Sequence, residues 1–140
     1  MLWRPWQTLR VPLLWILHVG YVWIPVHLAL RALSQFGLVP PPLATHAMTV
    51  GAIGALTLGM MARTAKGHTG RPLVADRYDV VAFALVTAAA ITRVLVPLVA
   101  IEAYGNAVTA SAIMWSAAFA IYAVRYWPIL TRPRVDGAPG

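Results

Sequence analysis

Hydrophobic positions fill four long stretches of the chain, and polar residues gather in the short segments between them. Each stretch is close to or slightly longer than the ~20 residues that an α-helix needs to cross the hydrocarbon core of a bilayer. None alternates as a half-buried strand does, and apolar residues occur on every helical face. The pattern predicts membrane-spanning helices at Val11–Ser34, Pro42–Ala62, Asp79–Ile101 and Ala107–Trp127.

The predicted fold class is all-α, with residues 1–140 forming one integral membrane bundle of four transmembrane helices. Short connections favour antiparallel neighbours. The first apolar run is longer than the core of a signal peptide, so we expect it to be retained as a helix.

Local signals predict where these helices begin and end. Proline at 40–42 can open the second helix, because the first turn needs no amide donor there. Asp79 is the expected N-cap of the third helix. A tight turn is expected at Tyr104–Asn106, and a frayed tail at Pro133–Gly140.

Composition supports a lipid environment. Sixty percent of the residues are hydrophobic and 11% are charged, whereas a soluble domain carries about 25% charged residues. The chain has no cysteine, so thiolates are excluded as metal ligands and a metal or haem must use His, Met, carboxylate or backbone groups.

The net charge of +7 indicates how the chain is oriented in the membrane and not a nucleic-acid-binding site, because most basic residues flank the apolar runs. The N-terminal arm, the middle loop and the C-terminal tail, which four crossings place on one side, hold nine of them: Arg4, Arg10, Arg63, Lys66, Arg71, Arg77, Arg125, Arg132 and Arg134. The positive-inside rule therefore predicts that both termini are cytoplasmic. Interfacial aromatic residues are expected on that side at Trp3, Trp6, Tyr126 and Trp127.

Four ionisable side chains lie at predicted membrane depth, where such groups are functional candidates. They are His18, His27, His46 and Arg93. At ~1.5 Å per residue, His27, His46 and Arg93 fall roughly 6–12 Å below the outer surface and could share one layer, whereas His18 lies nearer the cytoplasmic end. Pro97 withdraws the amide donor from the Arg93 carbonyl, which favours a polar pocket there.

Each of these features also has a structural interpretation. A helix histidine in a bundle is more often hydrogen-bonded to a neighbour than bound to metal. The small residues Ala47, Gly51, Ala55 and Gly59 at four-residue spacing favour close helix packing over room for a flat cofactor. Aromatic residues at 115, 119, 122 and 126 form one helix face that packs inside the bundle or against a partner.

Two segments suggest a family. The run from His46 to Gly54, followed by Thr57–Arg63 and by Gly67-His68-Thr69-Gly70-Arg71-Pro72, resembles the NnrS family. Weaker support comes from Leu17–Tyr21 and Tyr126–Leu130. The resemblance runs through nearly all of this chain and covers the C-terminal third of family members, which are usually much longer and have more helices.

The resemblance implies a haem- and copper-containing protein of the bacterial inner membrane, linked to nitric oxide metabolism, denitrification and protection from nitrosative stress. By position, His18, His46 and His68 match histidines of the family pattern and are the implied metal ligands, whereas His27 does not. Arg93 would pair with a haem propionate or another buried anion. Cofactor ligands from the additional helices of longer members would be absent here.

Three functions therefore stay open. The first is a haem- and copper-binding module with nitric oxide as a ligand. The second is a cofactor-free structural or partner subunit that docks on other membrane helices or on a second copy. The third is a small transporter with Arg93 in its path. The chain has no paired carboxylates, no evident nucleophile with a base and no nucleotide-binding loop, so catalysis has little support.

Overall fold

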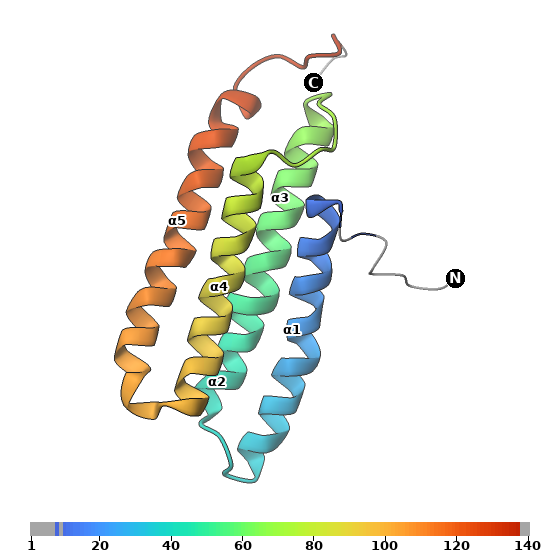
Figure 1. The fold of residues 1–140 in the computed structure, drawn as a ribbon. Helices are drawn as coiled ribbons and strands as arrows, with labels where there is room; N and C mark the ends of the chain where they lie inside the picture. Colours follow the sequence, from blue (N-terminus) through green and yellow to red (C-terminus); the bar gives the residue numbers. More distant parts are fainter. Residues whose placement is uncertain (1–7, 9, 138–140) are drawn as a thin grey trace, which may run out of the picture.

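Four antiparallel helical rods make up the structure, a computed structural model in which residues 8 and 10–137 are described (Figure 1). Every regular element of these residues is helical: α1 (Pro12–Gln35), α2 (Pro41–His46), a π-helical segment (Ala47–Ile53), α3 (Gly54–His68), α4 (Arg77–Val99), a 3₁₀ turn (Ile101–Ala103) and α5 (Tyr104–Leu130). The second rod runs through α2, the π segment and α3.

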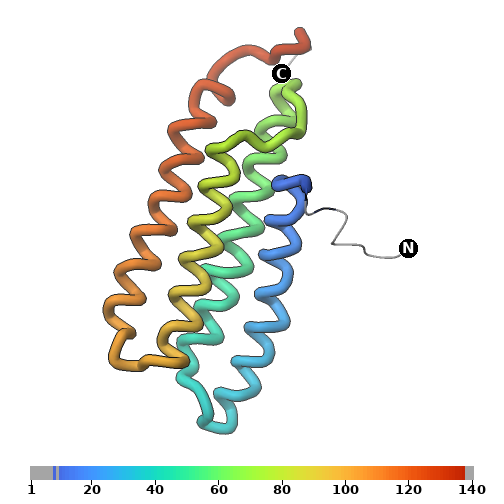
Figure 2. Tube along the Cα trace, viewed as in Figure 1, coloured from blue at the N-terminus to red at the C-terminus, as the bar shows by residue number. Residues whose placement is uncertain are grey.

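All four rods are long and apolar enough to cross a membrane, at Pro12–Gln35, Pro41–His68, Arg77–Val99 and Ile101–Leu130. The predicted fold class is confirmed. The start of α1 and the end of α5 lie at one end of the bundle (Figure 2). We call this the basic end; α3 ends there at His68 and α4 begins there at Arg77. The opposite end, with Gln35, Pro41 and Val99, is called the far end. The cytoplasmic location of the basic end stays a prediction.

The rods differ in how much neighbouring structure they touch. α3 and α4 lie in the middle, with α1 against the second rod and α5 mainly against α4 (Figure 1). Two buried clusters form the core, one towards the basic end around Leu13, Phe83 and Tyr126, and one towards the far end around Trp23 and Val94. α5 buries the smallest share of its residues, so one flank of the bundle is apolar and open.

Small residues of the second rod form the closest helix contact. Ala47, Gly51, Ala55 and Gly59 are all buried. A Cβ added at Gly51 would lie 2.5 Å from the Trp23 ring, and one at Gly59 would lie 2.8 Å from Ile16. The stripe therefore seats α1, which confirms the packing interpretation and leaves no room there for a flat cofactor.

Several predicted boundaries were wrong. The second rod ends at His68 rather than Ala62, so His68 belongs to a helix and not to a loop. Residues Tyr104–Asn106 open α5 instead of forming a turn, because the chain reverses through Ala100 and the 3₁₀ turn. Proline at 41 does open the second rod, as predicted.

The N-cap of α4 is Asp76 and not Asp79. The Asp76 carboxylate accepts the backbone N–H groups of Tyr78 and Asp79, while the Asp79 carboxylate accepts the N–H of Asp76 at 2.9 Å. This reciprocal capping box satisfies donors that an isolated Asp79 cap would leave without a partner.

The expected frayed tail is held down where it is described. The Val135 N–H donates to the Thr69 carbonyl at 3.2 Å, and Arg134 donates to the His68 carbonyl at 3.0 Å. Gly70 lies beneath with a φ of +71°, and an added Cβ would lie 2.6 Å from the Asp136 carboxyl carbon. The segment 134–136 thus covers the turn after α3.

Candidate functional site

Neighbouring helices fix the heights of the four histidines. α1 and the second rod are antiparallel, with Ile16 beside Gly59, Gly20 beside Leu56 and Trp23 beside Gly51. His18 therefore lies level with residues 57 and 58, in the first half of α3, about eleven residues or roughly 16 Å along the axis from His46. His68 is the last residue of α3, roughly 30 Å from His46 on the same estimate.

This spacing separates the predicted ligands. A metal ion holds imidazole nitrogens at about 2 Å, so His18, His46 and His68 of one chain cannot share an ion. Within the described part of the chain, no three His, Asp or Glu side chains come close enough to form such a site. Each of these three histidines can therefore serve only a separate site.

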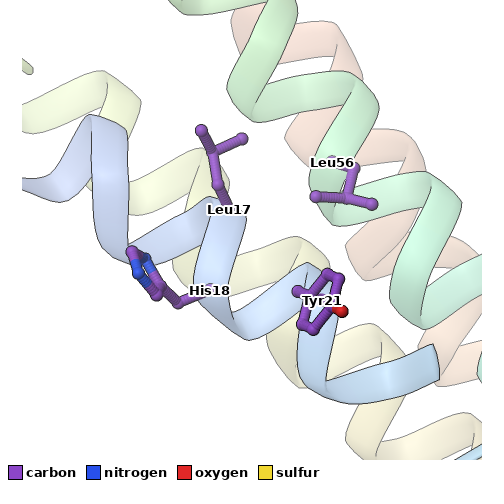
Figure 3. A pocket seen from close by; sticks show the side chains of 4 residues that line it. All are labelled: Leu17, His18, Tyr21 and Leu56. Carbon is purple, nitrogen blue, oxygen red and sulfur yellow. The ribbon is translucent and has the colours of Figure 1, made fainter. Parts of the chain in front are cut away.

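His18 lies at one edge of an open groove of about 440 Å³ between α1 and α3. Leu17, His18 and Tyr21 line it from α1 and Leu56 lines it from α3, with the His18 ring on the side away from Leu56 (Figure 3). The His18 Nδ1 lies 2.9 Å from the Leu14 carbonyl, which can only accept, so Nδ1 carries the proton. Nε2 then holds the lone pair that binds metals.

His27 contacts the second rod near the far end. Its Nδ1 donates to the Ala44 carbonyl at 2.7 Å, one helical turn ahead of the π segment. This bond ties α1 to α2 and gives a structural role to the one membrane-depth histidine that lies outside the family pattern.

His46 and Arg93 form the expected far-end grouping together with His27. His46 is half-buried at the end of α2 and interacts electrostatically with Arg93 of α4. The π segment begins at the next residue, Ala47, a feature that the sequence gave no signal for. Such segments are frequent at functional sites.

Arg93 faces a pocket of about 230 Å³ between the π segment, α4 and α5. Its wall includes Val50, Trp115 and the serines at 111 and 116. The Arg93 Nε is buried and has no hydrogen-bond partner. The Trp115 and Phe119 rings lie 4.2 Å apart and tilted by 31°, so the part of the predicted aromatic face nearer the far end reaches this pocket through Trp115.

A buried ion pair at the basic end was missed by the sequence reasoning. The Lys66 ammonium donates to Asp79 at 2.6 Å and to the Val74 carbonyl at 2.6 Å. The Tyr126 hydroxyl donates to the second Asp79 oxygen at 2.8 Å. Lys66, Asp79 and Tyr126 are 6%, 3% and 1% exposed. The available signal was that Lys66 follows the end of one predicted helix and that Asp79, thirteen residues later, begins the next.

Asp76 extends this network to the surface. Arg125 pairs with it at 2.8 Å. Partial burial opposes ionisation of Asp76, but the N–H of Asp79 and the Arg125 guanidinium outweigh it and lower the pKa of the carboxyl. Tyr126 also stacks on Tyr122 at 4.4 Å, so the part of the aromatic face nearer the basic end packs inside the bundle. The prediction that Tyr126 belongs to an interfacial belt was therefore wrong, because its ring is buried and its hydroxyl is bonded to Asp79. Trp127 of that belt is exposed, while Trp3 and Trp6 lie outside the described residues.

Comparison with known proteins identifies a family. The family model described as NnrS protein matches residues 1–134, which is most of the chain. Comparison with curated proteins and with solved structures gave no match. That the chain corresponds to the C-terminal third of longer members stays a prediction.

Proposed function

The chain belongs to the NnrS family, and we propose that it is a multi-pass protein of the bacterial inner membrane that binds haem through His18 and takes part in nitric oxide metabolism or protection from nitrosative stress. The observation that carries the proposal is the His18 groove. It combines an apolar wall, an imidazole in the metal-binding tautomer and a volume in the range of small-molecule sites.

The residues present fit a singly ligated iron better than a doubly ligated one. His18 and His46 are too far apart to hold one haem together, so His18 would be the histidine that holds a haem in this groove. A haem held by one histidine would supply a binding position for nitric oxide. The Leu14 carbonyl orients the His18 ring, and Leu17 and Leu56 give the groove an apolar lining.

His46 is the proposed second ligand position, for a separate haem or for copper, and Arg93 beside it would hold either a propionate of a haem bound there or another buried anion. His68 is exposed at the basic end, and the described residues place no group of three His, Asp or Glu side chains there, so a copper site at His68 would need further ligands. Copper therefore has weaker geometric support than haem.

The test is an absorption spectrum and metal analysis of the full chain purified in detergent. We expect a Soret band that His18→Ala abolishes and that His27→Ala retains, because His27 donates to the Ala44 carbonyl instead of facing the groove. His27→Ala is the matched control, since it removes an imidazole from the same helix. Nitric oxide added to the reduced protein should shift the band.

The open flank along α5 favours an alternative, a cofactor-free subunit that docks on other membrane helices or on a second copy. A colourless protein without bound metal, recovered as a stable oligomer or with a partner, would support this alternative and contradict the haem proposal.

A further inference from the structure

Arg93 lacks a negative partner within its own chain. The chain has four acidic residues, and the structure describes all of them. Asp79 pairs with Lys66, Asp76 with Arg125 and Asp136 with Arg134. The fourth, Glu102, is exposed beyond the far end of α4, and the guanidinium of Arg93 has no carboxylate of the described residues within 4.0 Å.

The position of Arg93 makes this lack of a partner costly. It lies six residues before the end of α4, about 9 Å inside the far end of the bundle. A charge at that depth needs a charged partner or water. The Nε atom of Arg93 is buried from solvent and has no hydrogen-bond acceptor among the described residues. Pairing with an anion from outside the chain would satisfy both the charge and the N–H donor.

The surroundings of Arg93 suit an oxyanion. The pocket of about 230 Å³ also presents Ser111 and Ser116, whose hydroxyls are donors to anionic oxygens. Val50 and Ala112 supply apolar walls, which strengthen an ion pair by excluding water. The planar guanidinium can offer two parallel N–H donors to a phosphate or carboxylate, which an ammonium cannot.

We propose that Arg93, Ser111 and Ser116 form an oxyanion-binding pocket at the far end of the bundle, which takes a phosphate group from an anionic phospholipid or a small free oxyanion. This pocket does not depend on haem binding at His18, which lies in the groove between α1 and α3.

The first test is thermal unfolding of the full chain in non-ionic detergent, with inorganic phosphate titrated at constant ionic strength. Phosphate that binds only the folded protein raises the midpoint in a saturable manner. We expect this rise in the wild type and in Arg31→Gln, and its loss in Arg93→Gln. Arg31 is the matched control because it is an exposed arginine of α1 near the same end. Arg93→Lys should weaken the affinity for phosphate roughly tenfold, because one charge-assisted hydrogen bond is lost.

The second test separates the two sources of the anion. The protein is extracted from vesicles of equal phosphatidylglycerol and phosphatidylethanolamine, and the lipids retained on it are measured by native mass spectrometry. Selective retention of phosphatidylglycerol that Arg93→Gln abolishes assigns a lipid phosphate. A phosphate-dependent midpoint without lipid selectivity assigns a free oxyanion.

The proposal is overturned if Arg93→Gln changes neither readout, or if the wild type shows neither. Arg93→Gln removes an uncompensated charge, so we expect it to fold, with a midpoint in phosphate-free buffer no lower than that of the wild type. A Soret band recorded on the same samples reports the haem proposal separately, so either can fail while the other holds.

Discussion

Breaking the Lys66–Asp79 pair should destabilise the protein more than any other single change at the basic end. The pair joins α3 to α4, and through Tyr126 it also reaches α5. Asp79→Asn keeps the shape of the side chain but leaves the Lys66 ammonium with neutral acceptors only. Lys66→Met leaves the Asp79 carboxylate with two donors, the Asp76 N–H and the Tyr126 hydroxyl.

The magnitude follows from burial. Both side chains are less than a tenth exposed, so the remaining charge cannot regain its hydration without disturbing the helix ends. Removing one partner of a buried pair costs about 3–5 kcal/mol, while replacing both partners is often close to neutral. We therefore expect each single variant to fall in this range, with Asp79→Asn the larger. The double variant Lys66→Met/Asp79→Asn should lose much less than the sum.

The assay is equilibrium unfolding of the four proteins in mixed detergent micelles, from which a double-mutant cycle gives the coupling energy. Arg63→Met is the matched control, because Arg63 is a cation on the same helix with no carboxylate within 4.0 Å among the described residues, and it should change stability by less than about 0.5 kcal/mol. Additive single effects, or losses below about 1 kcal/mol, would refute the reasoning and place Lys66 in water.

Three further sets of variants test the helix packing, the cap and the inter-helix bond. Gly51→Ala and Gly59→Ala should each lower the free energy of unfolding by about 1–3 kcal/mol, because the added methyl group pushes α1 away from the second rod. Gly105→Ala is the control and should not destabilise, because a Cβ there meets open space; equal effects at all three glycines would contradict the packing interpretation. Asp76→Asn keeps an N-cap acceptor but removes the negative charge, so it should cost about 0.5–2 kcal/mol at neutral pH through the loss of the Arg125 pair and of the charge at the N-terminus of α4. The pKa of Asp76 is lower in the folded protein than in the unfolded chain, so its stabilising contribution is complete above the unfolded pKa near 3.9 and is lost as pH falls through the folded pKa. The difference in unfolding free energy between wild type and Asp76→Asn should therefore disappear in acid titrations of stability. It should stay unchanged between pH 6 and 8. His27→Ala should lower stability by about 1 kcal/mol in thermal unfolding without loss of the Soret band, and a lost band would assign His27 to the cofactor.

Local sequence was sufficient for the helices and for the closest packing contact. Hydropathy adds up over consecutive residues, so four apolar stretches predict four crossings without knowledge of any neighbour. The stripe from Ala47 to Gly59 was predictable for the same reason, because its four-residue spacing lies within one helix. The histidines and Arg93 could be placed by depth, since depth is a count of residues along one helix.

Only the tertiary structure decided which polar groups meet. A shift of one residue turns a helical side chain by about 100° and raises it by about 1.5 Å, so pairing across helices depends on relative register and rotation that no single segment contains. That is why Asp79 proved to be the partner of Lys66 while Asp76 became the cap. For the same reason His18 and His46, joined by one family pattern, lie in different layers, and Arg93 lies in a pocket without a carboxylate.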